Sequence, residues 1–161
     1  MGSLREDVAL LVERSGAIAE QSACRAYYYP DIPDWVYDSI RKHISSNIRP
    51  TTVAAVIDVG LIKNAHRCLV FTTEGLYHRD YFTKQFFVRY EDVEFAFLEE
   101  SYIRLYAGDD TYDVSPVNVN DVEFDWLLEV LRLYIGDRNR QANAVPRLLE
   151  QPKISSHRLN E

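Results

Sequence analysis

The segment NDVEFDWLLEVLRLYI, residues 120–135, has the repeat of an amphipathic helix and decides the fold expected for this chain. Its apolar residues recur at spacings of three and four, which is the period of one helix face. Asn120 and Glu123 form a capping-box pattern at its start, and Gly136 ends it. The apolar stripe consists of Phe124, Leu127, Leu128, Leu131 and Ile135, with Trp126 beside it. Such a stripe predicts a helix that covers an apolar surface.

The preceding residues, 52–117, indicate a series of short antiparallel strands. Apolar and polar residues alternate there between turn signals such as Thr73-Glu74-Gly75 and Gly108-Asp109-Asp110. Val53-Ala-Ala-Val-Ile57 is continuously apolar, which predicts a strand buried on both faces. The predicted strands are 53–57, 66–72, 76–80, 85–89, 93–99, 102–106 and 112–114. Since no helical pattern separates them, an antiparallel meander is favoured.

Two more helices are predicted before the strands, at residues 3–22 and 33–46. Pro30 excludes a continuous helix through Ala26-Tyr-Tyr-Tyr-Pro30, and Pro33 suits a first helical turn. The expected fold is therefore α+β: a bent antiparallel sheet or half barrel of six to seven strands, capped by the C-terminal helix, with two N-terminal helices. An unclosed sheet with its helices on one face is the alternative. The expected division is an N-terminal helical extension (1–50), a sheet with its capping helix (51–136) and a flexible tail (137–161).

Composition and charge limit the partners that this chain can have. Its hydrophobic fraction of 47% is ample for a core, and no apolar run approaches the ~20 residues of a membrane span. With no signal-peptide pattern at its start, the expected location is cytoplasmic. The net charge is −7; residues 137–161 contribute +2, so residues 1–136 carry −9. This balance disfavours nucleic acid and favours a basic protein partner.

Two stretches resemble bacterial pleckstrin-homology-like (PH-like) domains. They are Val70-Phe-Thr-Thr-Glu-Gly-Leu-Tyr77 and Val88-Arg-Tyr-Glu-Asp-Val93. The resemblance covers residues 51–136 and implies a bent sheet closed by one C-terminal helix. In lipid-binding members, a basic cluster in the first strand–loop–strand holds the phosphates. Only Lys63 and Arg67 stand in that region here, so phosphoinositide binding is not expected.

The sequence contains no recognisable catalytic or metal-binding motif. Zinc-ligand spacings, glycine-rich phosphate loops and nucleophile elbows are all missing, so no catalytic residue, cofactor or metal is predicted and an enzyme is not expected. Cys24 and Cys68 are expected to be inert thiols. Two sets assembled from distant residues stay open. They are a metal set of His66, His78 and Asp80, and a carboxylate set of Asp58, Glu74, Asp80, Glu91 and Asp92.

Two groups of residues are candidates for a ligand or interface. The cations Lys63, Arg67, His78 and Arg79 could cluster near the hairpin 73–81 and hold an anion. The aromatic residues Tyr27, Tyr28, Tyr29, Tyr81 and Phe82 occur in dense runs, a composition typical of protein interfaces. The favoured alternative for Tyr27–Tyr29 is that they pack the N-terminal helices on the sheet.

The function expected from these observations is a non-enzymatic, intracellular bacterial module that binds another protein. A homodimer formed through an unpaired edge strand is consistent with an open sheet. The alternative is an acidic immunity or inhibitor protein that neutralises a basic toxin or a nucleic-acid-binding partner, because an acidic surface speeds encounter with a basic one.

Overall fold

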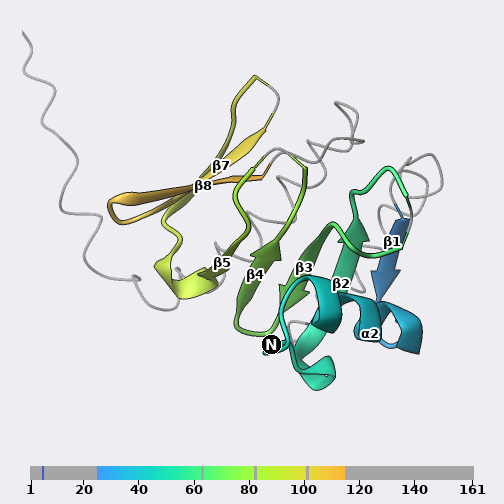
Figure 1. The fold of residues 1–161 in the computed structure, drawn as a ribbon. Coiled ribbons are helices and arrows are strands. Elements are labelled where there is room, and N and C mark those ends of the chain that lie inside the picture. Colours follow the sequence, from blue (N-terminus) through green and yellow to red (C-terminus); the bar gives the residue numbers. More distant parts are fainter. Residues whose placement is uncertain (1–4, 6–24, 63, 82, 101, 115–161) are drawn as a thin grey trace, which may run out of the picture.

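The computed structural model describes residues 5, 25–62, 64–81, 83–100 and 102–114. Within these residues the fold is α+β, with one α-helix and two antiparallel sheets (Figure 1). The expected helix 120–135, the tail 137–161 and, apart from Arg5, the expected helix 3–22 lie outside the described residues.

The strands follow one another in space in the order in which they occur in the chain. The five-stranded sheet has the order β1-β2-β3-β4-β5 and the three-stranded sheet the order β6-β7-β8. The elements are β1 (Arg25–Tyr28), α2 (Asp34–His43), the 3-10 helix η1 (Pro50–Thr52), β2 (Val53–Asp58), β3 (Cys68–Thr72), β4 (Gly75–His78), β5 (Phe86–Arg89), the 3-10 helix η2 (Tyr90–Asp92), β6 (Phe95–Leu98), β7 (Ile103–Ala107) and β8 (Asp110–Val114). The predicted positions of the seven strands from β2 onward and their antiparallel pairing with chain neighbours within each sheet are confirmed, but the meander is interrupted between β5 and β6.

Helix α2 forms where the sequence predicts a helix, with slightly shorter ends. Val36 and Ile40 lie one turn apart and are fully buried against the sheet. Asp34 in the first turn and Arg41 and Lys42 in the last turn complement the helix dipole. The apolar face thus fixes the helix on the sheet and leaves its charged residues in solvent.

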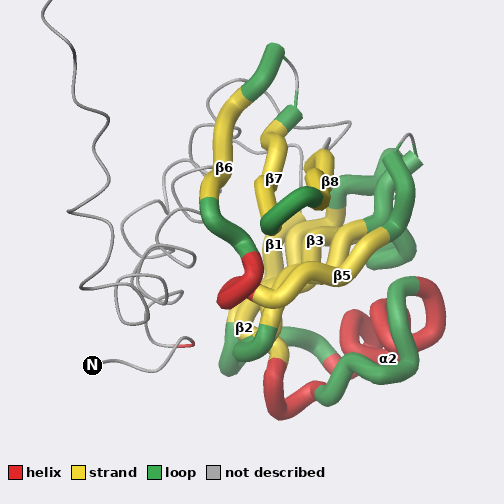
Figure 2. The backbone as a smooth tube through the Cα atoms, turned by 90° about the vertical axis from the view of Figure 1, so that its left-hand side faces the viewer, coloured by secondary structure: helices red, strands yellow, loops and turns green. Residues whose placement is uncertain are grey.

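The central strands β2 and β3 of the five-stranded sheet are buried on both faces, as the apolar run at residues 53–57 predicts for β2. All six residues of β2 and all five of β3 are buried. On β3, Cys68 and Val70 face α2, whereas Leu69 and Phe71 face the three-stranded sheet. Figure 2 shows α2 and the three-stranded sheet on opposite sides of this central layer.

The architecture differs from the expected single sheet of six to seven strands in two respects. Eight strands are described, and they divide into sheets of five and three that do not close into a barrel. The additional strand is β1, which pairs with β2 from Arg25↔Asp58 to Tyr28↔Ala55. β1 and α2, which the sequence assigned to an N-terminal extension, therefore pack in one body with the sheets.

Candidate functional site

Arg67 and Arg79, two of the candidate cations, have separate partners. The Arg67 guanidinium donates to the backbone carbonyl of Asp80 at 2.9 Å and lies 3.8 Å from the centre of the Tyr81 ring. The Arg79 guanidinium donates to the backbone carbonyl of His43 at the end of α2. Both guanidinium groups are therefore engaged with backbone carbonyls, Arg67 with that of Asp80 and Arg79 with that of His43. Lys63 and Phe82 lie outside the described residues.

The candidate tyrosines lie on β1 and directly after it, and they alternate between its faces. Tyr27 packs with the α2 cluster and meets the Trp35 ring edge-on at 5.6 Å between ring centres. Tyr28 packs on the opposite cluster, and burial raises its pKa to about 12. Tyr29 is 39% exposed, with the Arg5 guanidinium 4.1 Å from its ring centre. Tyr27 and Tyr28 thus contribute to packing, and Tyr29 is the accessible member.

His78 belongs to a buried polar group and not to the cation cluster. It is fully buried, and its Nε2 lies 3.6 Å from Oδ2 of Asp80, while Thr83 Oγ1 lies 3.4 Å from its Nδ1. Asp80 in turn accepts a 2.9 Å hydrogen bond from the backbone N–H of Thr83. A carboxylate, an imidazole and a hydroxyl are the components of a catalytic triad. Because the imidazole is inaccessible to solvent, this group is suited to holding the β4–β5 loop.

The buried imidazole makes stability depend on pH. Burial lowers the pKa of His78 to about 4, although the Asp80 carboxylate acts in the opposite direction. Between about pH 6.5 and 4, the unfolded chain therefore binds a proton that the folded chain does not, so stability falls as pH falls. We expect this to cost about 3 kcal/mol of unfolding free energy at pH 4.

Urea unfolding of the wild type and a His78→Gln variant, measured from pH 7 down to pH 5, checks this prediction. The variant should lose the part of the pH dependence that comes from the imidazole, so the difference between the two proteins should shrink as the pH is lowered. Parallel stability curves across this range would contradict it.

The carboxylates proposed as a two-acid set do not converge on one rim. Four of them have their own partners: Asp58 accepts from the backbone N–H groups of Gly60 and Ala65, Glu74 pairs with Arg49, Asp80 lies beside His78, and Glu91 pairs with Arg89. In the metal set, His78 lies beside Asp80, and His66 stacks on His43 with ring centres 3.6 Å apart. Among the described residues, no group of three or more His, Cys, Asp or Glu could hold a metal ion.

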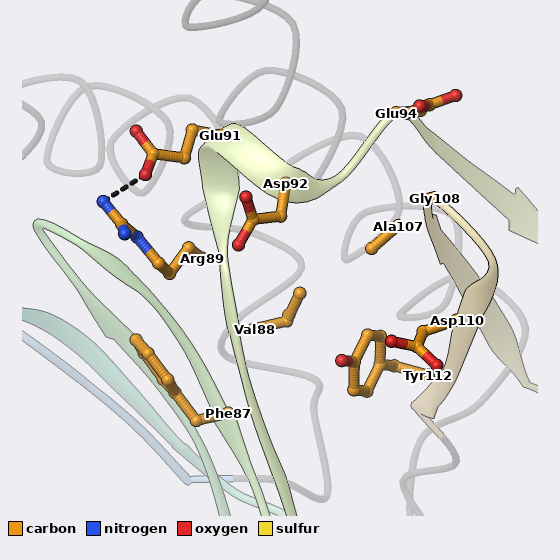
Figure 3. A pocket seen from close by; sticks show the side chains of 10 residues that line it. All are labelled: Phe87, Val88, Arg89, Glu91, Asp92, Glu94, Ala107, Gly108, Asp110 and Tyr112. Carbon is orange, nitrogen blue, oxygen red and sulfur yellow. Dashed lines mark ion pairs between the residues drawn. The ribbon is translucent and has the colours of Figure 1, made fainter.

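A groove of about 670 Å³ lies where the two sheets diverge, between β5 and η2 on one side and the β7–β8 hairpin on the other. This volume is within the ~300–1,000 Å³ typical of ligand pockets. Figure 3 shows Val88 and Asp92 on one side facing Ala107, Asp110 and Tyr112 on the other. Val88 is a buried residue of the core, and Ala107 and Tyr112 pack against that core. The floor of the groove is therefore apolar and continuous with the hydrophobic core.

The rim of this groove is acidic. Four acidic side chains and one basic side chain line it, and the basic one, Arg89, is paired with Glu91 at the outer end (Figure 3). The acidic residues are Glu91, Asp92, Glu94 and Asp110, all of them exposed. An apolar floor beneath a negatively charged rim is suited to a ligand that carries both apolar groups and positive charges.

The sequence does not predict this groove. It places Glu91 and Asp92 in the carboxylate set and in the stretch that resembles PH-like domains, and Asp110 in a turn. The two signals that bear on it are the Tyr90-Glu-Asp92 step after β5 and the Gly108-Asp109-Asp110 turn. Their meeting depends on how one sheet lies on the other, which strand periodicity does not specify.

Comparison with known proteins identified no relative, since no family model, curated protein or solved structure matches the chain. In the part of the chain that the structure describes, no helix combines the length and the apolarity needed to cross a membrane.

Proposed function

We propose that this protein is a non-enzymatic interaction module that binds a basic segment of a partner protein in the groove between β5–η2 and the β7–β8 hairpin. The observation that supports the proposal is the combination, in one groove, of an apolar floor with a rim of four carboxylates and a single, paired arginine. The net charge of −9 carried by residues 1–136 also favours a basic partner.

The apolar floor supplies affinity and the rim supplies selectivity. The half-buried Ala107 and Tyr112 offer apolar surface from which a ligand displaces water, and Val88 beside them is buried in the core. The exposed Asp92 and Asp110 face the same space from opposite sides (Figure 3), so a cationic side chain between them would approach both. Exposed charges of this kind contribute modestly to affinity and strongly to the rate and salt dependence of association.

Neutralising the rim should weaken binding without altering the fold. We expect an Asp92→Asn/Asp110→Asn variant to bind its partner about tenfold more weakly, since each exposed charge contributes roughly 0.5–1 kcal/mol. The measurement is retention of partner proteins from the native cell, followed by titration of the retained protein at low and high salt.

The matched control is an Asp31→Asn/Asp38→Asn variant. It carries the same change in charge at exposed positions in the segment that includes α2, on the opposite side of the central sheet from the three-stranded sheet. Wild-type affinity is expected for this control. Equal binding by both double variants, or binding insensitive to salt, would count against the groove.

The acidic rim also favours the second candidate, an immunity or inhibitor protein for a basic toxin or nucleic-acid-binding protein. The two candidates differ in the consequence of binding, because an inhibitor must abolish its partner's activity. A toxin gene next to the gene for this chain would support the inhibitor. Persistence of the partner's activity in the complex would exclude it.

We further propose that the chain is related to PH-like domains and that helix 120–135 closes an open end of the sheets. The support is the antiparallel pairing of consecutive strands within each of the two sheets and the apolar stripe of residues 120–135. An NMR or crystal structure that placed this helix away from both sheets would contradict the proposal.

A further inference from the structure

Among the described strands, β5 forms an edge of the five-stranded sheet, and this edge presents backbone groups to the groove. Adjacent residues of an antiparallel strand direct their N–H and C=O groups alternately toward and away from a given neighbour. The Tyr90 N–H donates to the Glu74 carbonyl at 3.3 Å, and the β4–β5 register continues from there. The hydrogen-bonded residues of β5 are therefore Val88 and Phe86, so the backbone groups of Phe87 and Arg89 point away from β4.

No strand lies on the other side of β5 in the described part of the chain, because β5 is the edge of its sheet. No backbone partner of Phe87 or Arg89 occurs among the described residues. Both residues line the groove. An unpaired edge that borders a groove of this size is a template for an added strand.

We propose that the partner segment binds as an extended strand that pairs antiparallel or parallel with β5, with apolar side chains facing the groove floor and Lys or Arg side chains reaching Asp92 and Asp110. This inference rests on the proposed function and adds the binding mode and the chemistry of the partner. Because side chains alternate along a strand, every second residue of the segment meets Val88 and Tyr112. The segment is therefore an alternating apolar and basic sequence.

A second copy of this chain is a poor occupant of the same edge. Pairing β5 with β5 of another copy would bring two acidic rims together, with one arginine in each rim already paired to Glu91. Like charges brought together at an interface oppose association. A basic strand has the complementary charge and leaves no carboxylate facing another.

The test uses the full chain and two short synthetic peptides of equal charge, a Lys–Val peptide in which the two residues alternate and the same sequence with every backbone nitrogen methylated. Methylation removes every backbone N–H, so the second peptide keeps the charge and the side chains and cannot donate to a strand ladder. We expect the unmethylated Lys–Val peptide to bind at least about tenfold more tightly. It should also slow amide hydrogen exchange at Phe87 and Arg89. Exchange at Ala26, whose amide faces the opposite edge of the sheet, should be unchanged.

The outcomes separate this inference from the proposed function. Equal binding of both peptides, weakened by Asp92→Asn/Asp110→Asn, would overturn strand addition while supporting a cation-binding groove. If neither peptide bound but a native partner still required the acidic rim, strand addition would also be overturned and the proposed function would be kept. If the chain alone dimerised and this slowed amide hydrogen exchange at Phe87 and Arg89, the occupant of the β5 edge would be a second copy and strand addition by a basic segment would be overturned. If neither the peptides nor any partner depended on the rim, both proposals would fail.

Discussion

An Asp58→Ala variant is expected to lose about 4 kcal/mol of unfolding free energy. Asp58 is 1% exposed at the end of β2, and its carboxylate accepts hydrogen bonds from the backbone N–H groups of Gly60 at 3.0 Å and Ala65 at 2.8 Å. Gly60 and Ala65 are buried as well, so truncation leaves two donors without water or acceptor. Each buried donor left unpaired costs about 1–3 kcal/mol. Urea unfolding measures the loss.

This carboxylate organises the whole β2–β3 loop. Ala65 has a positive φ of 55°, which costs energy for a residue with a side chain, and the bond to Asp58 compensates for it. Burial raises the pKa of the Cys68 thiol. The Asp58 carboxylate, which lies opposite Cys68 in the β2–β3 register, raises the pKa of the thiol further. The thiol is thus kept protonated, in agreement with the inert cysteine predicted from the sequence.

Two matched variants complete this experiment. Asp58→Asn keeps one carbonyl acceptor and should lose about half as much stability as Asp58→Ala. Asp38→Ala removes an exposed carboxylate from α2 and should change stability by less than about 0.5 kcal/mol. A loss below about 1 kcal/mol for Asp58→Ala would show that the two N–H groups find other acceptors.

A Gly75→Ala variant is expected to lose about 3 kcal/mol. Gly75 begins β4, and a Cβ atom there would collide with the backbone carbonyl of Val88 and lie 2.7 Å from Cε2 of Phe87. The carbonyl belongs to the neighbouring strand and cannot move without displacing β5. The Phe87 ring also packs against Tyr77, with ring centres 4.3 Å apart, so it has little freedom to move aside. Thermal or urea unfolding measures the effect.

Gly108→Ala is the control for Gly75→Ala. Gly108 has a φ of +61° in the β7–β8 turn, and nothing lies within 4 Å of a Cβ atom placed there. Its substitution should cost only the backbone strain, about 1 kcal/mol. If Gly108→Ala were the more damaging change, close packing of β5 over Gly75 would not be the reason for the glycine.

Much of the described fold was predictable because the local patterns are strong. The double burial of β2 follows from its unbroken apolar run, and α2 from the four-residue spacing of Val36 and Ile40. The turn before β4 follows from Thr72, whose hydroxyl accepts from the backbone N–H of Gly75 at 3.1 Å. Each of these depends on residues close together in the sequence.

The unpredicted features depend on long-range contacts. β1 was not recognised as a strand because Ala26-Tyr-Tyr-Tyr-Pro30 has no apolar and polar alternation; its tyrosines pack on both sides of the sheet. The division into two sheets was missed because the strand pattern continues past η2, where the chain passes from β5 to β6. Arg67 and Arg79, two members of the expected cation cluster, donate to different backbone carbonyls, which depends on contacts with segments distant in the sequence.

The groove was not predictable for the same reason, since Asp92 and Asp110 come from segments that only the stacking of the sheets brings together.

The role of the groove as the partner-binding surface is the central claim. The most direct test is photocross-linking in native cells from a benzophenone amino acid at Tyr112, which faces the groove from the β7–β8 hairpin (Figure 3), and at Trp35 on α2, which is 44% exposed. We predict that position 112 captures a partner through a segment rich in Lys or Arg and that position 35 does not. Capture of the same partner from position 35 alone would contradict the account.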